Sequence, residues 1–398
     1  MTQRKVVVLG GGMIGSAIAM DLSTDPGWSV TVADVNPEAL GRIAGRWRVE
    51  VREADLANPD VVRGVASDFD LVVGALPSAL GFQSLRAVIE AGRPCVDISF
   101  MPEDALGLDS LARERGVTAV VDCGVAPGVS NMMAGYGAAR LTRPERLEIY
   151  VGGLPVERRW PFDYKAGFAP HDVIEEYTRP ARLVEHGRIV VREALSEPEL
   201  MDFPGVGTLE AFNTDGLRSL VETLPIPFMK EKTLRYPGHI HLMRALRDTG
   251  FFSKQPLALG QQSVRPLDLT AALMFPKWTF QEGEADLTVL RVTIEGREGL
   301  EQVRYGWDLF DHFDEASGLR SMSRTTAFPA TQMARLLGRG AFARAGVHAP
   351  EAVGAVSGLL DAVLAGLEAR GVRTRTSVDR RPLPSAADEV LGGTGARA

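Results

Sequence analysis

Near its start the chain reads Val6-Val7-Val8-Leu9-Gly10-Gly11-Gly12-Met13-Ile14-Gly15, an apolar run that passes directly into a glycine turn. The run is too short for a helix, so it predicts a buried strand, and the Ala-rich residues 16–22 predict a helix after the turn. Residues 29–33 predict a second strand, which ends at Asp34 about 20 residues beyond the motif. A strand, Gly-x-Gly-x-x-Gly, a helix and a second strand with a terminal acid are together typical of a dinucleotide-binding fold.

The three motif glycines have different roles in such a turn. Gly10 permits the tight bend, Gly12 lets the backbone approach a pyrophosphate, and Gly15 lets the helix pack close to the strand. The pyrophosphate is expected at the helix N-terminus, where free N–H groups and the helix dipole favour an anion. Asp34 can accept hydrogen bonds from both ribose hydroxyls, and its charge would repel a 2′-phosphate. The sequence therefore predicts NAD rather than NADP as the cofactor.

The alternation of strands and helices continues beyond Asp34. Further strands are predicted at 47–52, 70–75, 94–97 and 117–121, with helices between them. Strands and helices in this order predict a Rossmann-type, doubly wound parallel sheet that binds ligands at the carboxyl ends of its strands. The predicted cofactor-binding residues lie at those ends: Gly10, Gly12, Met13, Ile14, Gly15, Asp34, Asp55, Ala75, Leu76 and Pro77.

The pattern changes after Asp122. Residues 147–151, 233–236, 285–295, 302–310 and 319–327 predict strands of a second, mixed α/β domain with an antiparallel sheet. Helices predicted at 331–337 and 354–370 are expected to return to the first domain. The predicted division is therefore a nucleotide domain at 1–129 and 326–376, a substrate and dimerisation domain at 130–325, and a flexible tail at 377–398 that is rich in Pro, Ser, Gly and Ala.

Composition narrows the class of protein. The chain has 398 residues, with 45% apolar and 24% charged residues, as in ordinary globular proteins. A net charge of −7 argues against nucleic acid as a partner, and no apolar stretch approaches the length of a membrane span. The N-terminus does not resemble a signal peptide, and Cys95 and Cys123 fit reduced, buried thiols. We expect a cytoplasmic protein without a disulfide or a metal site.

The loop after the sixth predicted strand, Asp122-Cys123-Gly124-Val125-Ala126-Pro127-Gly128, resembles that of the saccharopine dehydrogenase-like reductases. Residues 150–155, 209–214, 233–239 and 338–340 resemble the oxidatively deaminating branch of this family, lysine 6-dehydrogenase. In that branch NAD removes a hydride from the ε-carbon of L-lysine, water adds to the imine and ammonia leaves. The product, allysine, cyclises to a piperideine carboxylate. The resemblance also implies a homodimer formed through the second domain, and residues 287–290 would suit an intersubunit sheet.

Two other functions stay open. Lys165, after Tyr164, resembles the saccharopine- and carboxyspermidine-forming enzymes, in which a cation would suit a second substrate carboxylate. The second hypothesis is therefore the reductive condensation of an amino-acid semialdehyde with an amino acid, which Asp34 and Gly152-Gly153-Leu154-Pro155 disfavour. The third is an NAD-sensing protein that keeps the nucleotide fold without turnover.

Candidate site residues follow from the chemistry of amine oxidation. An ammonium group has no lone pair to drive hydride loss, so a general base must remove its proton. Asp122 and His239 are the candidate bases, although each could instead only stabilise a turn. Arg235 could clamp the α-carboxylate of an amino-acid substrate through its planar fork. The other predicted substrate contacts are Tyr164, Lys165, Thr214 and Arg324.

Overall fold

A seven-stranded, entirely parallel sheet forms the first half of the computed structural model, which describes residues 3–168 and 170–383. The strand order is β17-β6-β5-β4-β1-β2-β3. Its strands are β1 (Arg4–Leu9), β2 (Trp28–Asp34), β3 (Glu50–Glu53), β4 (Leu71–Gly74), β5 (Cys95–Asp97), β6 (Thr118–Val120) and β17 (Gly346–His348). The predicted Rossmann-type sheet is confirmed, with β17 as one additional edge strand contributed from late in the chain.

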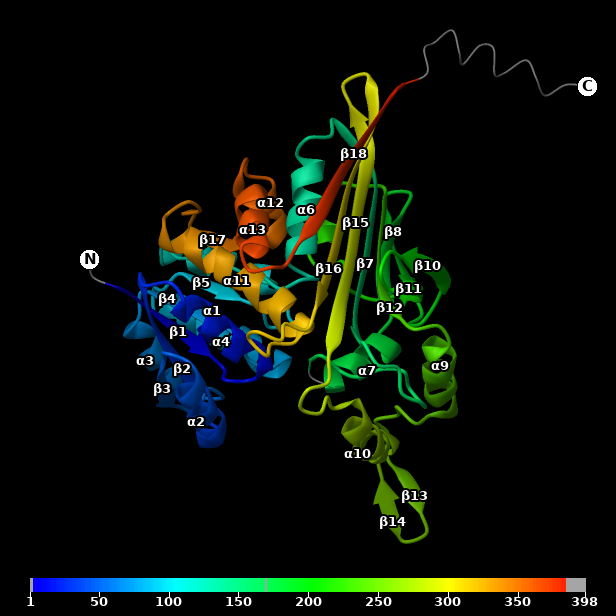
Figure 1. Cartoon of the computed structure of the whole chain (residues 1–398), viewed down its shortest axis with the longest axis horizontal. Helices are drawn as coiled ribbons and strands as arrows, with labels where there is room; N and C mark the ends of the chain where they lie inside the picture. The colour runs from blue at the N-terminus through cyan, green and yellow to red at the C-terminus, as the bar shows by residue number, and fades with distance from the viewer. Residues whose placement is uncertain (1–2, 169, 384–398) are drawn as a thin grey trace, which may run out of the picture.

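Helices cover both faces of this sheet (Figure 1). The first set follows the strands in order: α1 (Met13–Ser23), α2 (Pro37–Arg46), α3 (Pro59–Ser67), α4 (Ser78–Glu90), the 3₁₀ turn η1 (Ala105–Leu108) and α5 (Asp109–Glu114). Local sequence explains where they begin. The side chain of Asn36 accepts hydrogen bonds from the N–H groups of Glu38 and Ala39, and Pro37 occupies the first helical position of α2.

The second half of the chain builds a nine-stranded mixed sheet. Its main path is β10-β11-β12-β7-β15-β16-β18, in which β12 and β7 are parallel and the other neighbours are antiparallel. The strands are β7 (Arg143–Pro155), β8 (Ala181–Glu185), β9 (Arg188–Arg192), β10 (Glu199–Phe203), β11 (Gly207–Asn213), β12 (Phe228–Arg235), β15 (Asp286–Glu298), β16 (Glu301–His312) and β18 (Thr374–Pro382).

The prediction of a flexible tail from residue 377 is wrong for its first part, which belongs to strand β18. Residues 374–382 pair in register with β16, so the segment 377–382 is an edge strand of the second sheet rather than a tail. Its side chains are almost all exposed, so it lacks the alternation of buried and exposed residues that reveals a strand in a sequence. Leu383 follows the strand and donates through its N–H to Leu300 O (3.0 Å), and residues 384–398 of the predicted tail lie outside the described residues.

Two other expectations for the second half are wrong. Residues 319–327 were expected to form a strand, but Ser321 begins helix α11 (Ser321–Gly338). This helix is buried on nearly all sides, and periodicity does not distinguish such a helix from a buried strand. Residues 287–290 were expected to form an intersubunit sheet, but β15 is paired on one edge with β7 and on the other with β16.

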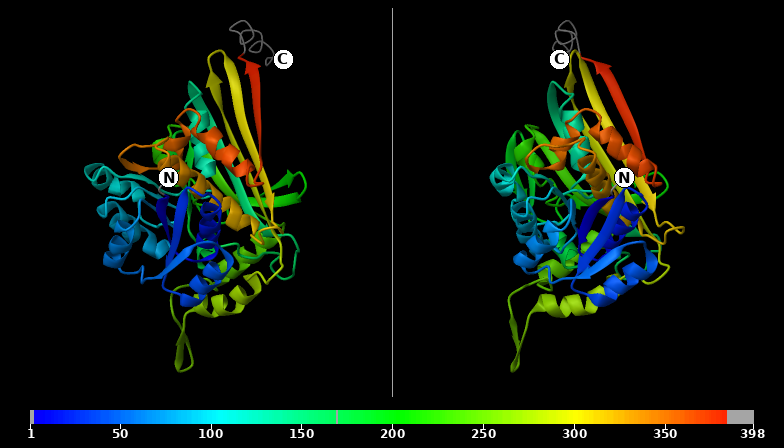
Figure 2. Two further views of the ribbon diagram at one scale, coloured as in Figure 1. Left: turned by 60° about the vertical axis from the view of Figure 1, so that its left-hand side comes forward. Right: turned by 90° about the vertical axis from the view of Figure 1, so that its left-hand side faces the viewer.

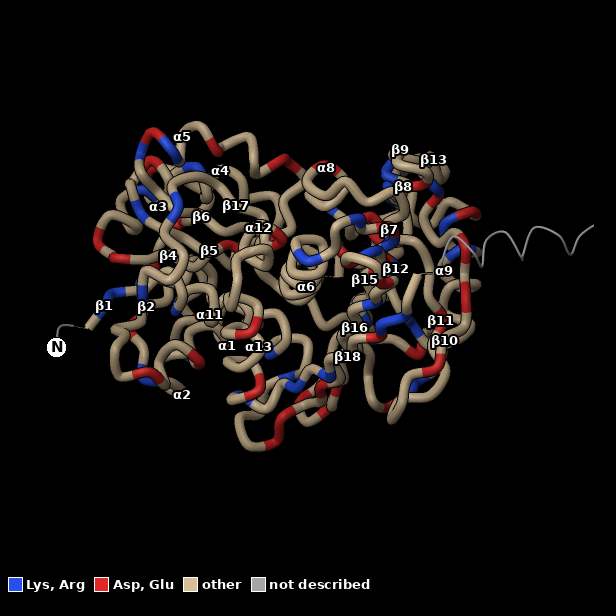
Figure 3. The backbone as a smooth tube through the Cα atoms, turned by 90° about the horizontal axis from the view of Figure 1, so that it is seen from above, with Lys and Arg blue, Asp and Glu red and all other residues tan. Residues whose placement is uncertain are grey.

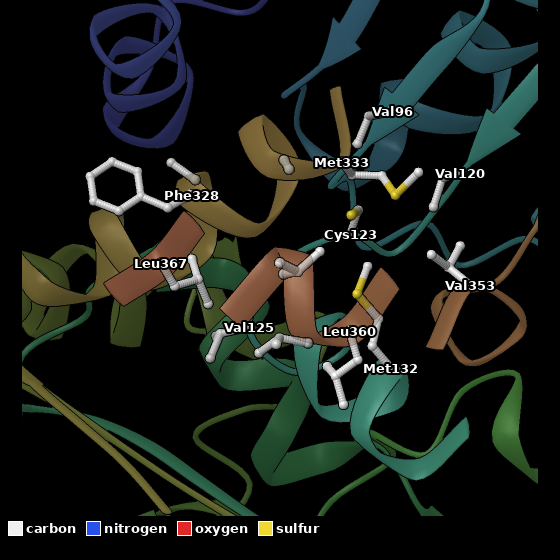
Figure 4. Close-up of a cluster of buried hydrophobic side chains, with 14 of the residues drawn as sticks. Val96, Val120, Cys123, Val125, Met132, Phe328, Met333, Val353, Leu360 and Leu367 are labelled. Carbon is white, nitrogen blue, oxygen red and sulfur yellow. The ribbon is translucent and has the colours of Figure 1, made fainter. Parts of the chain in front are cut away.

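Helices α6 (Val129–Ala138), α11, α12 (Pro350–Gly354) and α13 (Leu359–Glu368) join the two sheets. Their apolar side chains meet those of β5, β6 and the loop after β6 in one buried cluster, which includes Val96, Cys123, Met132, Met333 and Leu360 (Figure 4). Helices α6 and α12 cross without room for a side chain, since a Cβ at Gly135 would overlap the backbone of Glu351. The two halves of the molecule therefore share one core.

The remaining elements lie at the far end of the second sheet. They are α7 (Pro170–Thr178), α9 (His239–Thr249), α10 (Pro266–Trp278) and the hairpin of β13 (Leu257–Leu259) and β14 (Gln262–Val264), which projects from the body (Figure 2). Helix α8 (Leu220–Thr223) is the exception, because it lies beside α12, where Thr223 Oγ1 donates to Glu351 Oε1 (2.6 Å). Acidic and basic positions are interspersed over both halves (Figure 3). Within residues 3–168 and 170–383, every helix is too short or too polar to cross a membrane.

A buried ion cluster ties the first helix to the last ones. The carboxylate of Asp21 in α1 accepts hydrogen bonds from Thr331 Oγ1 (2.5 Å), from Arg335 Nη1 (2.7 Å) and from Arg370 Nε. Arg335 Nη2 also donates to the backbone oxygen of Asp21 (2.9 Å). Both side chains of the Asp21–Arg335 pair are about 95% buried, with exposed fractions of 5% and 6%. Residues more than three hundred positions apart therefore fix α1 against α11.

Removing one partner of this cluster should be costly, because the other charges stay buried without compensation. We expect Asp21→Ala to lower the free energy of unfolding by about 3–5 kcal/mol, measured by urea denaturation. Asp68→Ala is the matched control: it removes the exposed ion pair with Arg52 and should cost less than about 1 kcal/mol. Equal costs for the two variants would contradict the role given to the cluster.

Candidate active site

A cavity of about 620 Å³ lies between the two sheets. One part of its wall comes from the carboxyl ends of β1, β2, β4 and β5, the edge at which parallel α/β sheets bind ligands. The opposite part comes from β7, α7, β12, the loop between β11 and α8, and the first turns of α11. The lining residues on this second side are Val151, Gly152, Gly153, Phe168, Pro170, Asp172, Glu175, Glu176, Arg179, Thr214, Asp215, Gly216, Glu231, Thr233, Arg235, Met322 and Thr326.

The glycine turn at the first side fits a dinucleotide. Gly10 has a φ of +105°, and a Cβ at Gly15 would overlap the carbonyl oxygen of Gly10, so both positions need glycine. A Cβ at Gly12 would meet only open space, which leaves room for a ligand at the backbone. The first intrahelical hydrogen bond runs from Ser16 N to Gly12 O (2.9 Å), and the N–H groups of the first turn of α1 before it are available to an anion.

Nine of the ten predicted cofactor-binding residues line the cavity: Gly10, Gly12, Met13, Ile14, Gly15, Asp34, Ala75, Leu76 and Pro77. The turn itself holds Asp34, whose Oδ2 accepts a hydrogen bond from Gly11 N (2.6 Å) and whose Oδ1 accepts one from Asn36 N (2.8 Å). Asp55 is the exception. Its side chain is exposed and accepts a hydrogen bond from Ala57 N (3.1 Å), so the structure does not bring it to the cavity.

Asp122, a predicted base, does not line the cavity. Its backbone has a φ of +50°, and its carboxylate pairs with Arg218, with Nε 3.2 Å from Oδ2. Burial raises the pKa of Asp122, whereas the Arg218 guanidinium acts in the opposite direction. This carboxylate therefore stabilises the structure by neutralising a partly buried arginine, rather than by binding the backbone N–H groups of a turn as the sequence alternative supposed.

His239, the other predicted base, is also outside the cavity lining. It begins α9, is only 4% exposed, and uses both ring nitrogens. The distance from Nδ1 to the carbonyl oxygen of Phe162 is 2.8 Å, so Nδ1 carries the proton, and Nε2 accepts a hydrogen bond from the Tyr177 hydroxyl (2.9 Å). Burial and then the charge of Arg235 lower the pKa of His239 to about 3. The imidazole is therefore neutral and has no free nitrogen for a substrate proton.

Arg235 does line the cavity, as predicted for a carboxylate clamp. Arg235 is only 2% exposed. Its Nη2 pairs with Glu176 Oε2 (2.6 Å), and its Nε donates to the Tyr177 hydroxyl (3.2 Å). The guanidinium lies over the ring of Tyr164, 4.4 Å from its centroid. Tyr164, Tyr177 and His239 thus form a layer behind Arg235 that fixes its orientation, and Tyr164 is not a cavity residue.

The structure does not bring the other two predicted cations to the cavity. Lys165 Nζ pairs with Glu284 Oε2 (2.5 Å) and donates to Thr279 O (3.0 Å). Arg324 donates to His312 O (3.1 Å) and Arg370 O (2.9 Å), and lies 3.5 Å from Asp311. Lys165 therefore holds the segment before α7 against the one after α10, and Arg324 joins α11 to β16 and to the end of α13.

Sequence reasoning missed the carboxylates that surround the second half of the cavity. Glu231 is the most buried of them, with an exposed fraction of 4%. Its carboxylate accepts a hydrogen bond from the Thr214 hydroxyl, and that hydroxyl also lies 2.9 Å from the hydroxyl of Thr233. Burial raises the pKa of Glu231 to about 8. A usable signal existed, because alternate residues of a strand share a face and Glu231 is four residues before Arg235.

Comparison with known proteins agrees with this architecture. The family profile described as the saccharopine dehydrogenase NADP binding domain matches residues 6–120, and that described as the saccharopine dehydrogenase C-terminal domain matches residues 124–372. The chain belongs to the saccharopine dehydrogenase family. It is therefore a member of a family of oxidoreductases that bind a pyridine nucleotide.

Curated relatives in this family differ in name. The chain is 22% identical to a saccharopine dehydrogenase [NADP(+), L-glutamate-forming] from Pyricularia oryzae, over 77% of this chain and 71% of the relative. It is also 22% identical to a carboxyaminopropylagmatine dehydrogenase from Synechocystis, over 86% of this chain and 91% of the relative. Its match to mouse alpha-aminoadipic semialdehyde synthase is 23% identical and covers only 30% of that longer protein.

The fold is shared with a solved member of the family. Saccharopine dehydrogenase (L-Glu forming) from Saccharomyces cerevisiae superposes with a TM-score of 0.78 at 17% identity, over 94% of this chain and all of that one. The paired sheets of the saccharopine dehydrogenase family are thus retained in this chain although five residues in six differ.

The position of Asp34 gives a direct test of cofactor choice in this family member. Asp34→Ala should remove hydrogen bonds to the ribose hydroxyls and the repulsion of a 2′-phosphate. We expect the Kd for NAD to rise roughly 10- to 100-fold, which corresponds to about 1.5–3 kcal/mol for hydrogen bonds to a charged group, and the preference over NADP to fall.

Calorimetric titration of both nucleotides measures this change. Asp60→Ala, at an exposed carboxylate of α3, is the control and should leave both affinities unchanged. An unaltered preference in Asp34→Ala would show that Asp34 does not contact the ribose.

Proposed function

We propose that this enzyme catalyses the NAD-dependent oxidative deamination of L-lysine at its ε-carbon. The products are ammonia and allysine, which cyclises to piperideine-6-carboxylate. The observation that carries the proposal is the charge of the cavity beyond the nucleotide turn. Five carboxylates line this part, with the cations Arg179 and Arg235: Asp172, Glu175, Glu176, Asp215 and Glu231. Glu175, Glu176 and Asp215 pair with Lys254, Arg235 and Arg182. Among the described residues, Asp172 and Glu231 have no basic side chain within ion-pair distance, and such carboxylates in a partly enclosed pocket favour a substrate that carries an ammonium group.

The two cations suit the other end of an amino acid. Arg235 is fixed by Glu176, Tyr177 and Tyr164, so its fork is oriented before substrate arrives. A substrate α-carboxylate would share this guanidinium with Glu176. Because Glu176 is itself buried, which raises its pKa, the pair can take up a proton as the second carboxylate arrives.

The walls between the charged groups are apolar and close-fitting. Phe168, Met322 and Val151 face the cavity, and a Cβ at Gly153 would overlap the Met322 side chain. Such walls suit the methylene chain of lysine and exclude water from the ε-carbon. Asp34 supports NAD as the partner, and bound NAD would accept the hydride from that carbon. The chain's own residues then have to bind the amino acid and move its protons.

A second candidate function is the reductive condensation of a semialdehyde with an amino acid. The names of the Pyricularia oryzae and Synechocystis relatives favour it. Lys165, the residue in the sequence that favours condensation, does not support this function in the structure. It is paired with Glu284 and does not line the cavity. The acidic lining is also a poor match for saccharopine, which carries more carboxylates than lysine does.

The assay that tests the proposal combines two products. Purified protein with NAD and L-lysine should form NADH and ammonia in equal amounts, followed by absorbance for the first and by an enzymatic ammonia assay for the second. Saccharopine with NAD or NADP is the comparison substrate. Reduced nucleotide from saccharopine, with none from lysine, would contradict deamination and establish the condensing activity.

A further inference from the structure

We infer that Glu231 is the acid–base residue of this site, taking the proton of the substrate ε-ammonium and later that of the attacking water. The inference rests on the proposed oxidation of an amine. It gives Glu231 the role for which Asp122 and His239 were the sequence candidates, neither of which lines the cavity.

Backbone geometry aims Glu231 at the cavity. It lies on β12, where Glu231, Thr233 and Arg235 all line the cavity, as alternate residues of a strand should. The intervening Lys232 is directed elsewhere, with Nζ 2.6 Å from Glu197 O. The loop after β11 closes over the carboxylate: Thr214 donates to it, and a Cβ at Gly216 would overlap it. Its orientation is therefore set by contacts on two sides.

Among the described residues, Glu231 has no basic side chain within ion-pair distance. Most other carboxylates near the cavity have one: Asp122 pairs with Arg218, Glu176 with Arg235, Asp215 with Arg182 and Glu175 with Lys254. Asp172 is partly exposed and accepts a hydrogen bond from the Ser78 hydroxyl. A buried carboxylate without a counter-ion is a site for a cation. The substrate ammonium would supply that missing charge.

The surroundings also suit proton transfer near neutrality. The charged groups that act on Glu231 are Glu176 of α7, which is itself paired with Arg235, and Asp215 of the loop after β11. Burial, with the nearby Glu176 and Asp215 charges, brings the pKa of Glu231 to about 8, against hydrogen bonds from Thr214 and Gly216 that lower it. A general base works best with a pKa near the working pH.

Glu231 would carry protons at two stages of the reaction. The Glu231 carboxylate removes a proton from R–CH₂–NH₃⁺, and the neutral amine then loses hydride from its ε-carbon, giving R–CH=NH₂⁺ while the proton on Glu231 passes to solvent. The regenerated carboxylate takes a proton from water as its oxygen attacks the imine carbon. Protonated Glu231 returns that proton to the amine of R–CH(OH)–NH₂. The C–N bond then breaks as the hydroxyl proton passes to the leaving ammonia, so the aldehyde and ammonium leave. The one net proton of the whole reaction is the one that Glu231 passed to solvent after the oxidation.

Glu231→Gln tests the role, since glutamine keeps the shape and can still accept the bond from Thr214. We expect kcat to fall about 100-fold or more. The rise of kcat/KM with pH, centred near 8 in the wild type, should disappear, while NAD affinity stays unchanged. Glu210→Gln is the matched control: this buried carboxylate of the neighbouring strand lies outside the cavity lining and should keep wild-type kinetics.

The same experiment separates the residue's role from the function. If the wild type oxidises saccharopine but not lysine, deamination is wrong, and the Glu231→Gln comparison on saccharopine still decides the acid–base role. Near wild-type kcat and pH profile in Glu231→Gln, on whichever amine is oxidised, would overturn the inference. If the wild type oxidises neither amine, both the function and the role are overturned.

A substrate-free measurement checks the proton affinity itself. The folded pKa of Glu231 is raised above its ordinary value of 4.5, so its contribution to stability is fully present below about pH 4.5 and is lost as pH rises towards 8. Glutamine does not titrate. The melting temperature of Glu231→Gln, relative to wild type, should therefore increase between pH 5 and pH 8. A constant difference over this range would contradict a proton held by Glu231.

Discussion

The close contact between helix α1 and the turn after β1 is the constraint on which the rest of the structure depends. Helix and turn meet with no room for a side chain at Gly15, so the N-terminus of α1 is fixed at the carboxyl edge of the first sheet. The same helix carries Asp21, whose buried carboxylate binds Arg335 and Arg370. One short helix thus sets both the phosphate-binding turn and the place where the last third of the chain docks.

That docking in turn sets the distance between cofactor and substrate. Helix α11 begins at the end of the second sheet, where Asp286 accepts hydrogen bonds from Ser321 N (2.7 Å) and Met322 N (3.0 Å). It then runs back to α1, where Thr331 and Arg335 donate to the carboxylate of Asp21. Its first turns place Met322 and Thr326 in the cavity wall. The position of α11 is therefore determined at its start by Asp286 of the second sheet and further along by the Asp21 ion cluster beside the first sheet. The cavity lies between the two sheets that these contacts hold together.

The sequence predicted most where the signal is local and failed where contacts are distant. The glycine turn, Asp34 and the strand ends at Ala75–Pro77 follow from short patterns, and all of these residues line the cavity. By contrast, Lys165 and Arg324 are cations whose partners, Glu284 and Asp311, come from elements far along the chain or on another layer. Nothing in a stretch of sequence shows that an arginine is already neutralised. Strand β18 was missed for a related reason. It is held by pairing with the distant strand β16, and its side chains are nearly all exposed, so the sequence shows no alternation of buried and exposed residues.

Burial explains why Glu231, and not His239, is suited to acid–base chemistry in this structure. Removing water always disfavours the charged form, so it lowers the pKa of a base and raises that of an acid. For His239 this shift moves the pKa from 6.5 to about 3, away from neutrality, and the imidazole becomes a fixed neutral link between Phe162 and Tyr177. For Glu231 the same effect moves the pKa from 4.5 to about 8, towards the range in which the proposed amine substrate would have to lose its proton. In a cavity shielded from water, a lone carboxylate is therefore the better proton carrier, even though histidine is the residue that titrates near neutrality in solution.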